Sequence, residues 1–131
     1  MKHRWKRRLW KDERGSATIE AVLWTPIFVF FILLVVDASM LFFNQAQVFR
    51  IVQDNNRAFA VGRVESLAET EANVRAALAA FSRDATVEST VQGNFLRTDV
   101  SVRAGDLGGV GLLAVFRDLQ LRISAQHLVE S

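Results

Sequence analysis

The chain has 131 residues, of which 50% are hydrophobic, with one proline, no cysteine and a formal net charge of +2. This length leaves room for one small domain, and the lack of cysteine excludes disulfides, thiolate nucleophiles and cysteine-ligated metals. The two histidines, His3 and His127, are not at ligand spacing, so we expect no metal and no cofactor.

The charges are unevenly distributed along the chain. Residues 1–14 contain every lysine and carry seven basic residues against two acidic ones, a net charge of +5. Residues 15–131 carry nine arginines against twelve acidic residues, a net charge of −3. Among these arginines, a set lacks interleaved aromatic residues and is offset by acids, so we expect no nucleic-acid partner. The set is Arg63, Arg75, Arg83, Arg97 and Arg103.

An apolar run follows the basic cluster. Residues 21–36, AVLWTPIFVFFILLVV, carry no charge, and the apolar character resumes after Asp37 as far as Phe43. A helix of this length measures roughly 35 Å and can cross a hydrocarbon core of about 30 Å. We therefore predict a transmembrane helix over residues 16–43. A buried core helix is the alternative, but so small a domain rarely encloses a helix that is apolar all round.

The charge difference across the run predicts its orientation. Basic residues precede the run and few follow it, so the positive-inside rule places residues 1–15 in the cytoplasm and exports residues 44–131.

Two residues inside the predicted transmembrane helix need explanation. We expect Pro26 in the first or second turn of the helix, where its missing N–H costs little. Asp37 has two interpretations. An ionisable group within the bilayer is costly unless it is paired, which predicts an intramembrane polar contact with another helix. Alternatively, the membrane ends at Val36 and Asp37 marks the exit.

The junction between cations and apolar run has a recognisable order. Arg14-Gly15-Ser16-Ala17-Thr18-Ile19-Glu20 resembles the cleavage site of type IV prepilins, where a membrane peptidase cuts after the glycine and the apolar helix is retained. The resemblance implies that Gly15 ends a basic leader, that Ser16 becomes the new N-terminus and that Glu20 is the acidic fifth residue. Such a carboxylate can neutralise the α-amino group of a neighbouring subunit. A first-turn glutamate also suits the helix dipole without any partner.

A longer stretch resembles a narrower family. Residues 14–63 are similar to the N-terminal half of TadE-like pseudopilins of tight-adherence (Flp) pili, with Glu20, an early Pro26, a late Asp37 and a polar continuation over residues 45–60. The major Flp pilins place a tyrosine after the glutamate, whereas this chain has Ala21 and no tyrosine. The resemblance thus implies a minor pilin or pseudopilin.

The resemblance also implies partners and a location. The partners are a prepilin peptidase, other pilins, the pilus assembly platform and the lipid bilayer, and the location is the bacterial inner membrane. An uncleaved single-pass scaffold or interaction protein is the alternative. A small hydrolase with an ordinary signal sequence, cut near Ala38 or Ser39, is disfavoured because Asp37 interrupts that site and no nucleophile constellation follows.

The exported part predicts an α+β, pilin-like fold. Apolar residues continue at helical spacing to a C-cap at Gly62, so the transmembrane helix extends as a stalk. Ser66 to Glu69 fits a capping box that begins a second helix ending near Ser82. Alternating residues around a Gly93-Asn94 turn predict a hairpin, and residues 119–126 predict a third antiparallel strand. One face of this sheet is expected to lie on the second helix and the arginine-bearing face in solvent.

No set of residues predicts catalysis. The carboxylates Glu65, Glu69 and Glu71 lie at the start of the second helix, where the helix dipole favours them. The glycines of residues 104–111 match no nucleotide-binding motif. We therefore expect a structural protein and no enzyme.

Overall fold

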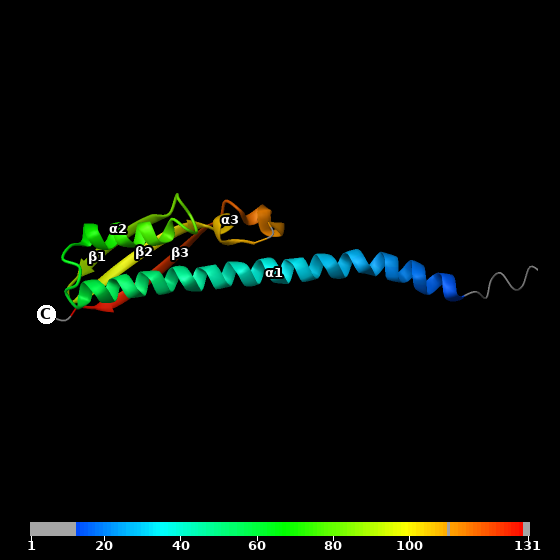
Figure 1. Cartoon of the computed structure of the whole chain (residues 1–131), viewed down its shortest axis with the longest axis horizontal. Helices are drawn as coiled ribbons and strands as arrows, with labels where there is room; N and C mark the ends of the chain where they lie inside the picture. Colours follow the sequence, from blue (N-terminus) through cyan, green and yellow to red (C-terminus); the bar gives the residue numbers. More distant parts are fainter. Residues whose placement is uncertain (1–12, 110, 130–131) are drawn as a thin grey trace, which may run out of the picture. The chain divides into compact units, whose positions relative to one another are not determined.

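The computed structural model describes residues 13–109 and 111–129 (Figure 1). The elements in order are α1 (Glu13–Ala60), α2 (Leu67–Leu78), β1 (Thr86–Gln92), β2 (Phe95–Arg103), α3 (Ala104–Leu107), the 3₁₀ helix η1 (Leu112–Phe116) and β3 (Gln120–Leu128). A long apolar N-terminal helix, a second helix and a three-stranded antiparallel sheet confirm the predicted α+β class. Of the predicted leader, residues 1–15, the first twelve residues lie outside the described part of the chain.

The chain divides into two units, an N-terminal unit that ends at Val35 and a C-terminal unit that begins at Val36. The N-terminal unit contains the first part of α1. Because α1 begins at Glu13, Pro26 lies in its interior, and the expectation that Pro26 occupies the first or second turn was wrong. The proline ring cannot donate to the carbonyl four residues earlier. The neighbouring Thr25 hydroxyl donates to the Ala21 carbonyl at 2.6 Å.

The C-terminal end of α1 is closed by the predicted glycine. Gly62 adopts a φ of +72°, a conformation that glycine accepts at no steric cost. Its N–H donates to the Phe59 carbonyl at 3.0 Å, and the Arg63 N–H donates to the Ala58 carbonyl at 2.9 Å. This pair of hydrogen bonds is the Schellman motif, so the prediction of a cap at Gly62 is confirmed.

Helix α2 begins as the sequence predicts and ends earlier. The Ser66 hydroxyl caps it by accepting from the Glu69 N–H at 3.1 Å. The helix ends at Leu78 and not near Ser82, because the Leu78 carbonyl accepts from both the Phe81 and Ser82 N–H groups in a tight turn. That turn directs the Ser82 hydroxyl to the carboxylate of Asp106, to which it donates.

The sheet has the strand order β1-β2-β3, and both pairs are antiparallel. Gln92 pairs with Phe95, which leaves Gly93 and Asn94 as a two-residue turn, and Gly93 has a φ of +61°. A glycine with positive φ at the first central position is typical of a type II′ hairpin turn. The predicted hairpin is therefore confirmed.

One face of the sheet forms the core together with both helices. The central strand β2 alternates strictly, and its buried residues are Leu96, Thr98, Val100 and Val102. This face lies on α2, as expected, and α1 also contributes to the core. The shared cluster includes Val48 and Val52 of α1 and Val74 and Leu78 of α2. Figure 1 shows the strands beside the C-terminal part of α1.

Candidate functional site

The predicted cleavage motif lies at the start of α1. The backbone at Gly15 and Ser16 is helical, and the structure describes side chains from Ala17 onward. The Glu20 side chain is exposed. Glycine lowers helix stability by about 1 kcal/mol relative to alanine, so Gly15 weakens this first turn of α1.

The apolar run of α1 has no buried residue. The candidate span falls within Ala17–Ala60, where an 18-residue window has a mean hydropathy of 2.5 and none of that window is buried. By length and composition this helix can cross a membrane. Its exposed large side chains include Ile19, Val22, Leu23, Phe28, Phe31 and Ile32. Side chains of this kind require a lipid or protein partner.

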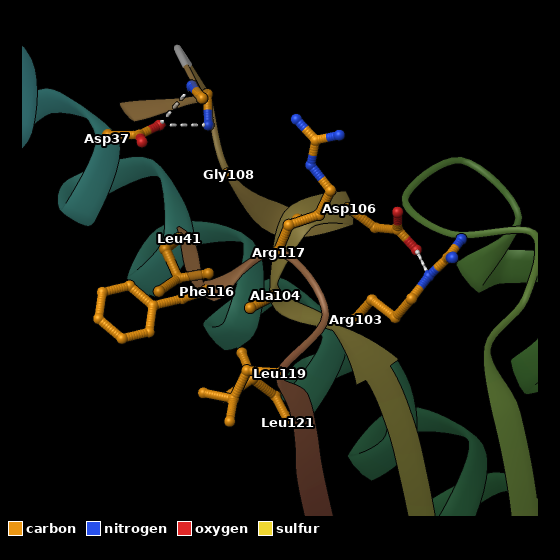
Figure 2. A pocket seen from close by; sticks show the side chains of 13 residues that line it. Asp37, Leu41, Arg103, Ala104, Asp106, Gly108, Phe116, Arg117, Leu119 and Leu121 are labelled. Atoms are coloured by element: carbon orange, nitrogen blue, oxygen red, sulfur yellow. Dashed lines mark hydrogen bonds and ion pairs between the residues drawn. The ribbon is translucent and has the colours of Figure 1, made fainter. Parts of the chain in front are cut away.

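Asp37 belongs to the C-terminal unit and is bound by another segment of that same unit. The carboxylate is completely buried, and its Oδ1 accepts hydrogen bonds from the N–H of Gly109 at 2.8 Å and of Gly111 at 3.3 Å (Figure 2). Oriented backbone N–H groups of this kind compensate the loss of water around a buried carboxylate. The sequence singled out Asp37, but it gave no indication that its partners lie in the glycine-rich segment.

The segment that binds Asp37 is a loop between β2 and β3, residues 104–119, which we call the latch loop. Its base is closed by two backbone hydrogen bonds, from the Ala104 N–H to the Leu119 carbonyl at 2.8 Å and from the Gly105 N–H to the Arg117 carbonyl at 3.1 Å. The Asn44 side chain of α1 donates to the Leu107 carbonyl at 2.8 Å. The latch loop is thus hydrogen-bonded to two residues of α1, Asp37 and Asn44.

Glycines allow the latch loop to approach its neighbours closely. A Cβ atom on Gly109 would lie 3.1 Å from Met40 Cγ, and one on Gly105 would lie 2.5 Å from Arg117 Cγ. A Cβ at Gly105 requires Arg117 to shift, and one at Gly109 requires Met40 to give by a few tenths of an ångström. Gly105 and Gly109 therefore allow these two close contacts.

A cavity of about 450 Å³ lies beneath the latch loop (Figure 2). Its lining is mixed, with the apolar Leu41, Phe116, Leu119 and Leu121 and the charged Asp37, Arg103, Asp106 and Arg117. Arg103 forms ion pairs with Asp84 at 2.7 Å and with Asp106 at 3.6 Å. Of the charges that line this cavity, Arg103 and Asp106 pair with each other, and Asp37 is bound by the backbone N–H groups of Gly109 and Gly111. Within residues 13–109 and 111–129, no group of three or more potential metal ligands was found.

A second polar link fixes α1 to the sheet. Asn56 is fully buried, and its Oδ1 accepts from the Thr98 hydroxyl at 2.7 Å while its Nδ2 donates to the Ala125 carbonyl at 3.2 Å. The Ser89 hydroxyl lies 2.9 Å from that of Thr98. These residues join α1 to all three strands. Sequence reasoning missed them, because a lone asparagine on a polar helix is ordinarily solvated.

The fold and these contacts define a class of protein. An exposed apolar helix long enough to span a membrane continues into a small α+β unit, and the latch loop of that unit binds the acidic residue directly after the apolar run. The family model described as TadE-like protein matches residues 15–53, which confirms the resemblance predicted from Glu20, Pro26 and Asp37. The chain therefore carries a TadE-like, pilus-associated segment, and its apolar helix fits a single-pass inner-membrane protein. Searches of curated proteins and of solved structures each found no match.

Proposed function

We propose that the chain is a minor pilin or pseudopilin of a tight-adherence (Flp) type pilus or a related secretion system. In this function a prepilin peptidase removes residues 1–15, and the apolar helix then enters or primes a filament that serves adhesion. The observation that carries the proposal is the position of Gly15 and Glu20. Both stand at the boundary between the basic cluster and the apolar run, and the TadE-like match begins at Gly15.

Glu20 has a physical role in this proposal. Cleavage creates an α-amino group at Ser16, and a positive charge in a low-dielectric environment requires a partner. A carboxylate on a neighbouring subunit supplies that partner through a charge-assisted hydrogen bond and fixes the axial register of the two helices. The side chain of Glu20 is exposed, as a contact with a neighbouring subunit requires.

The orientation follows from the charges. The basic cluster remains cytoplasmic, and the C-terminal unit lies on the outer side of the inner membrane. Its partners are the peptidase, other pilins and the assembly platform.

The deciding experiment is mass spectrometry of the protein isolated from membranes of cells with an active prepilin peptidase. We expect a mature N-terminus at Ser16, and we expect Gly15→Ala to abolish processing. Gly108→Ala is the matched control, because a Cβ there meets its nearest atom at an ordinary 3.7 Å. An intact N-terminus in the unsubstituted protein, or unchanged size and function of Gly15→Ala, would support the uncleaved scaffold instead.

A second experiment tests the glutamate. Glu20→Ala should be processed normally and should be recovered in sheared filaments or in crosslinked pilin complexes in reduced amount. Asp54→Ala, an exposed carboxylate further along the same helix, is the control. If Glu20→Ala assembled normally, Glu20 would make no subunit contact and would only favour the start of the helix.

A further inference from the structure

The latch loop presents apolar side chains outward. Val115 of η1 is 89% exposed, Phe116 is 57% exposed and Leu119 is 55% exposed. These residues belong to a loop that is held in place by the hydrogen bonds at Asp37 and Asn44. A small unit that fixes a loop and still exposes its apolar residues has a surface that is suited to a partner.

The position of this surface indicates which partner it meets. Asp37, which the latch loop binds, directly follows the uncharged run that ends at Val36. If α1 spans the membrane, Asp37 stands where the helix leaves the hydrocarbon, because irregular backbone such as the latch loop is not exposed to lipid tails. The residues of η1 then lie at the level of the lipid headgroups.

The chemistry of the surface fits that level. Headgroup regions accept short apolar segments that carry a cation, since the apolar side chains reach the acyl boundary while the charge remains among the phosphates. Arg117 directly follows Phe116, and an arginine can keep its aliphatic stem on apolar surface while its guanidinium contacts phosphate. Met40 and Phe43 of α1, in the same unit, are exposed as well.

We propose that η1 is a second membrane contact, which rests in the headgroup region of the leaflet from which α1 emerges. The occupant of this surface is the phospholipid bilayer. The inference requires that α1 spans the membrane, but it does not require cleavage after Gly15. Failure of one proposal therefore leaves the other untouched.

The lack of cysteine in the chain makes the proposal directly testable. Val115→Cys carries a nitroxide label in the full chain, reconstituted in nanodiscs of phosphatidylethanolamine and phosphatidylglycerol. The collision rate of the label with oxygen, which concentrates in lipid, is compared with that of a water-soluble nickel complex. Ile32→Cys in the apolar run is the lipid reference, and Thr90→Cys, at an exposed position of β1, is the water reference. All three sites are exposed, so labelling leaves the core intact.

We expect the oxygen-to-nickel ratio at position 115 to lie well above that at position 90 and toward that at position 32. A ratio equal to that at position 90 would overturn the proposal. The measurement is repeated with one copy and with several copies per nanodisc. Shielding from nickel that develops only with several copies would show that a second chain covers η1, which would also overturn the proposal. Shielding in single-copy nanodiscs supports the bilayer.

Discussion

The carboxylate of Asp37 accepts a hydrogen bond at 2.8 Å from the N–H of Gly109, a residue 72 positions later in the chain. This contact joins the residue that ends the apolar run of α1 to the latch loop between β2 and β3. The carboxylate that an isolated helix would expose is therefore part of the folded C-terminal unit.

Asp37→Ala tests the strength of that contact. The substitution removes the charged acceptor of the Gly109 and Gly111 N–H groups, and a hydrogen bond to a charged group contributes about 1.5–3 kcal/mol. We expect a lower thermal midpoint in detergent and faster hydrogen exchange at residues 109 and 111. Asp54→Ala, at an exposed position of the same helix, should leave both unchanged. Equal exchange in the two variants would contradict a restraining role for Asp37.

Gly105→Ala tests the close approach at the base of the latch loop. The added Cβ would lie 2.5 Å from Arg117 Cγ and 3.1 Å from the Arg117 carbonyl oxygen, so Arg117 has to shift. We expect a loss of about 1–3 kcal/mol in the free energy of unfolding, in the range of overpacked sites. Gly108→Ala, with φ of −75° and no contact under 3.7 Å, should be nearly neutral. Denaturant unfolding of both variants decides, and similar losses would refute the steric explanation.

Thr98→Val tests the polar link between α1 and the sheet. Valine keeps the shape but removes the hydroxyl that serves Asn56 and Ser89, which costs about 1–3 kcal/mol in the free energy of unfolding. The control is Thr90→Val, because Thr90 is exposed on β1 and such substitutions stay within about 0.5 kcal/mol. If both variants unfolded at the same denaturant concentration, the link would contribute nothing to stability.

Asp99, on the outer face of the sheet, contributes to the stability of the folded state in a pH-dependent way. Hydrogen bonds from the Arg97 guanidinium lower the pKa of Asp99 below its ordinary 3.8, partial burial opposes this, and Ser124 and Arg122 assist the lowering. Because the folded state favours the ionised form, the stabilisation is present above pH 3.8 and is lost as pH falls through the lowered value.

The measurement is the thermal midpoint as a function of pH. Asp99→Asn should lower the midpoint at neutral pH by an amount that shrinks with added salt, and the difference from the unsubstituted protein should vanish in acid. Asp84→Asn is the control, since the Asp84 side chain is 70% exposed. A deficit of Asp99→Asn that persists unchanged in acid would point to lost packing in place of lost charge.

Local rules predicted much of the fold. The cap at Gly62, the N-cap at Ser66 and the turn at Gly93-Asn94 each depend on a few neighbouring residues, and the structure has all three. The predicted end of α2 was wrong because the turn after Leu78 depends on a residue far away in the sequence. This turn brings Ser82 to Asp106. Errors of this kind arise where tertiary contacts override helix propensity.

The candidate site was less accessible to sequence reasoning. Gly15, Ser16, Glu20 and Asp37 could be singled out from charge and order. The latch loop could not, because a glycine-rich segment indicates flexibility unless its neighbours are known, and nothing local relates residue 37 to residue 109. Asn56 likewise resembles any polar helix residue until Thr98 and Ala125 are placed beside it.

The order in which the partners of α1 are synthesised has a consequence for biogenesis. Asn44 pairs with Leu107, and Asn56 pairs with Thr98 and Ala125, so the first helix to leave the ribosome receives these partners from the last third of the chain. Nascent chains that stall before β2 hold both asparagines without these partners and the valines of α1 uncovered. The buried polar contacts of α1 are therefore complete only when β3, which contains Ala125, has been synthesised.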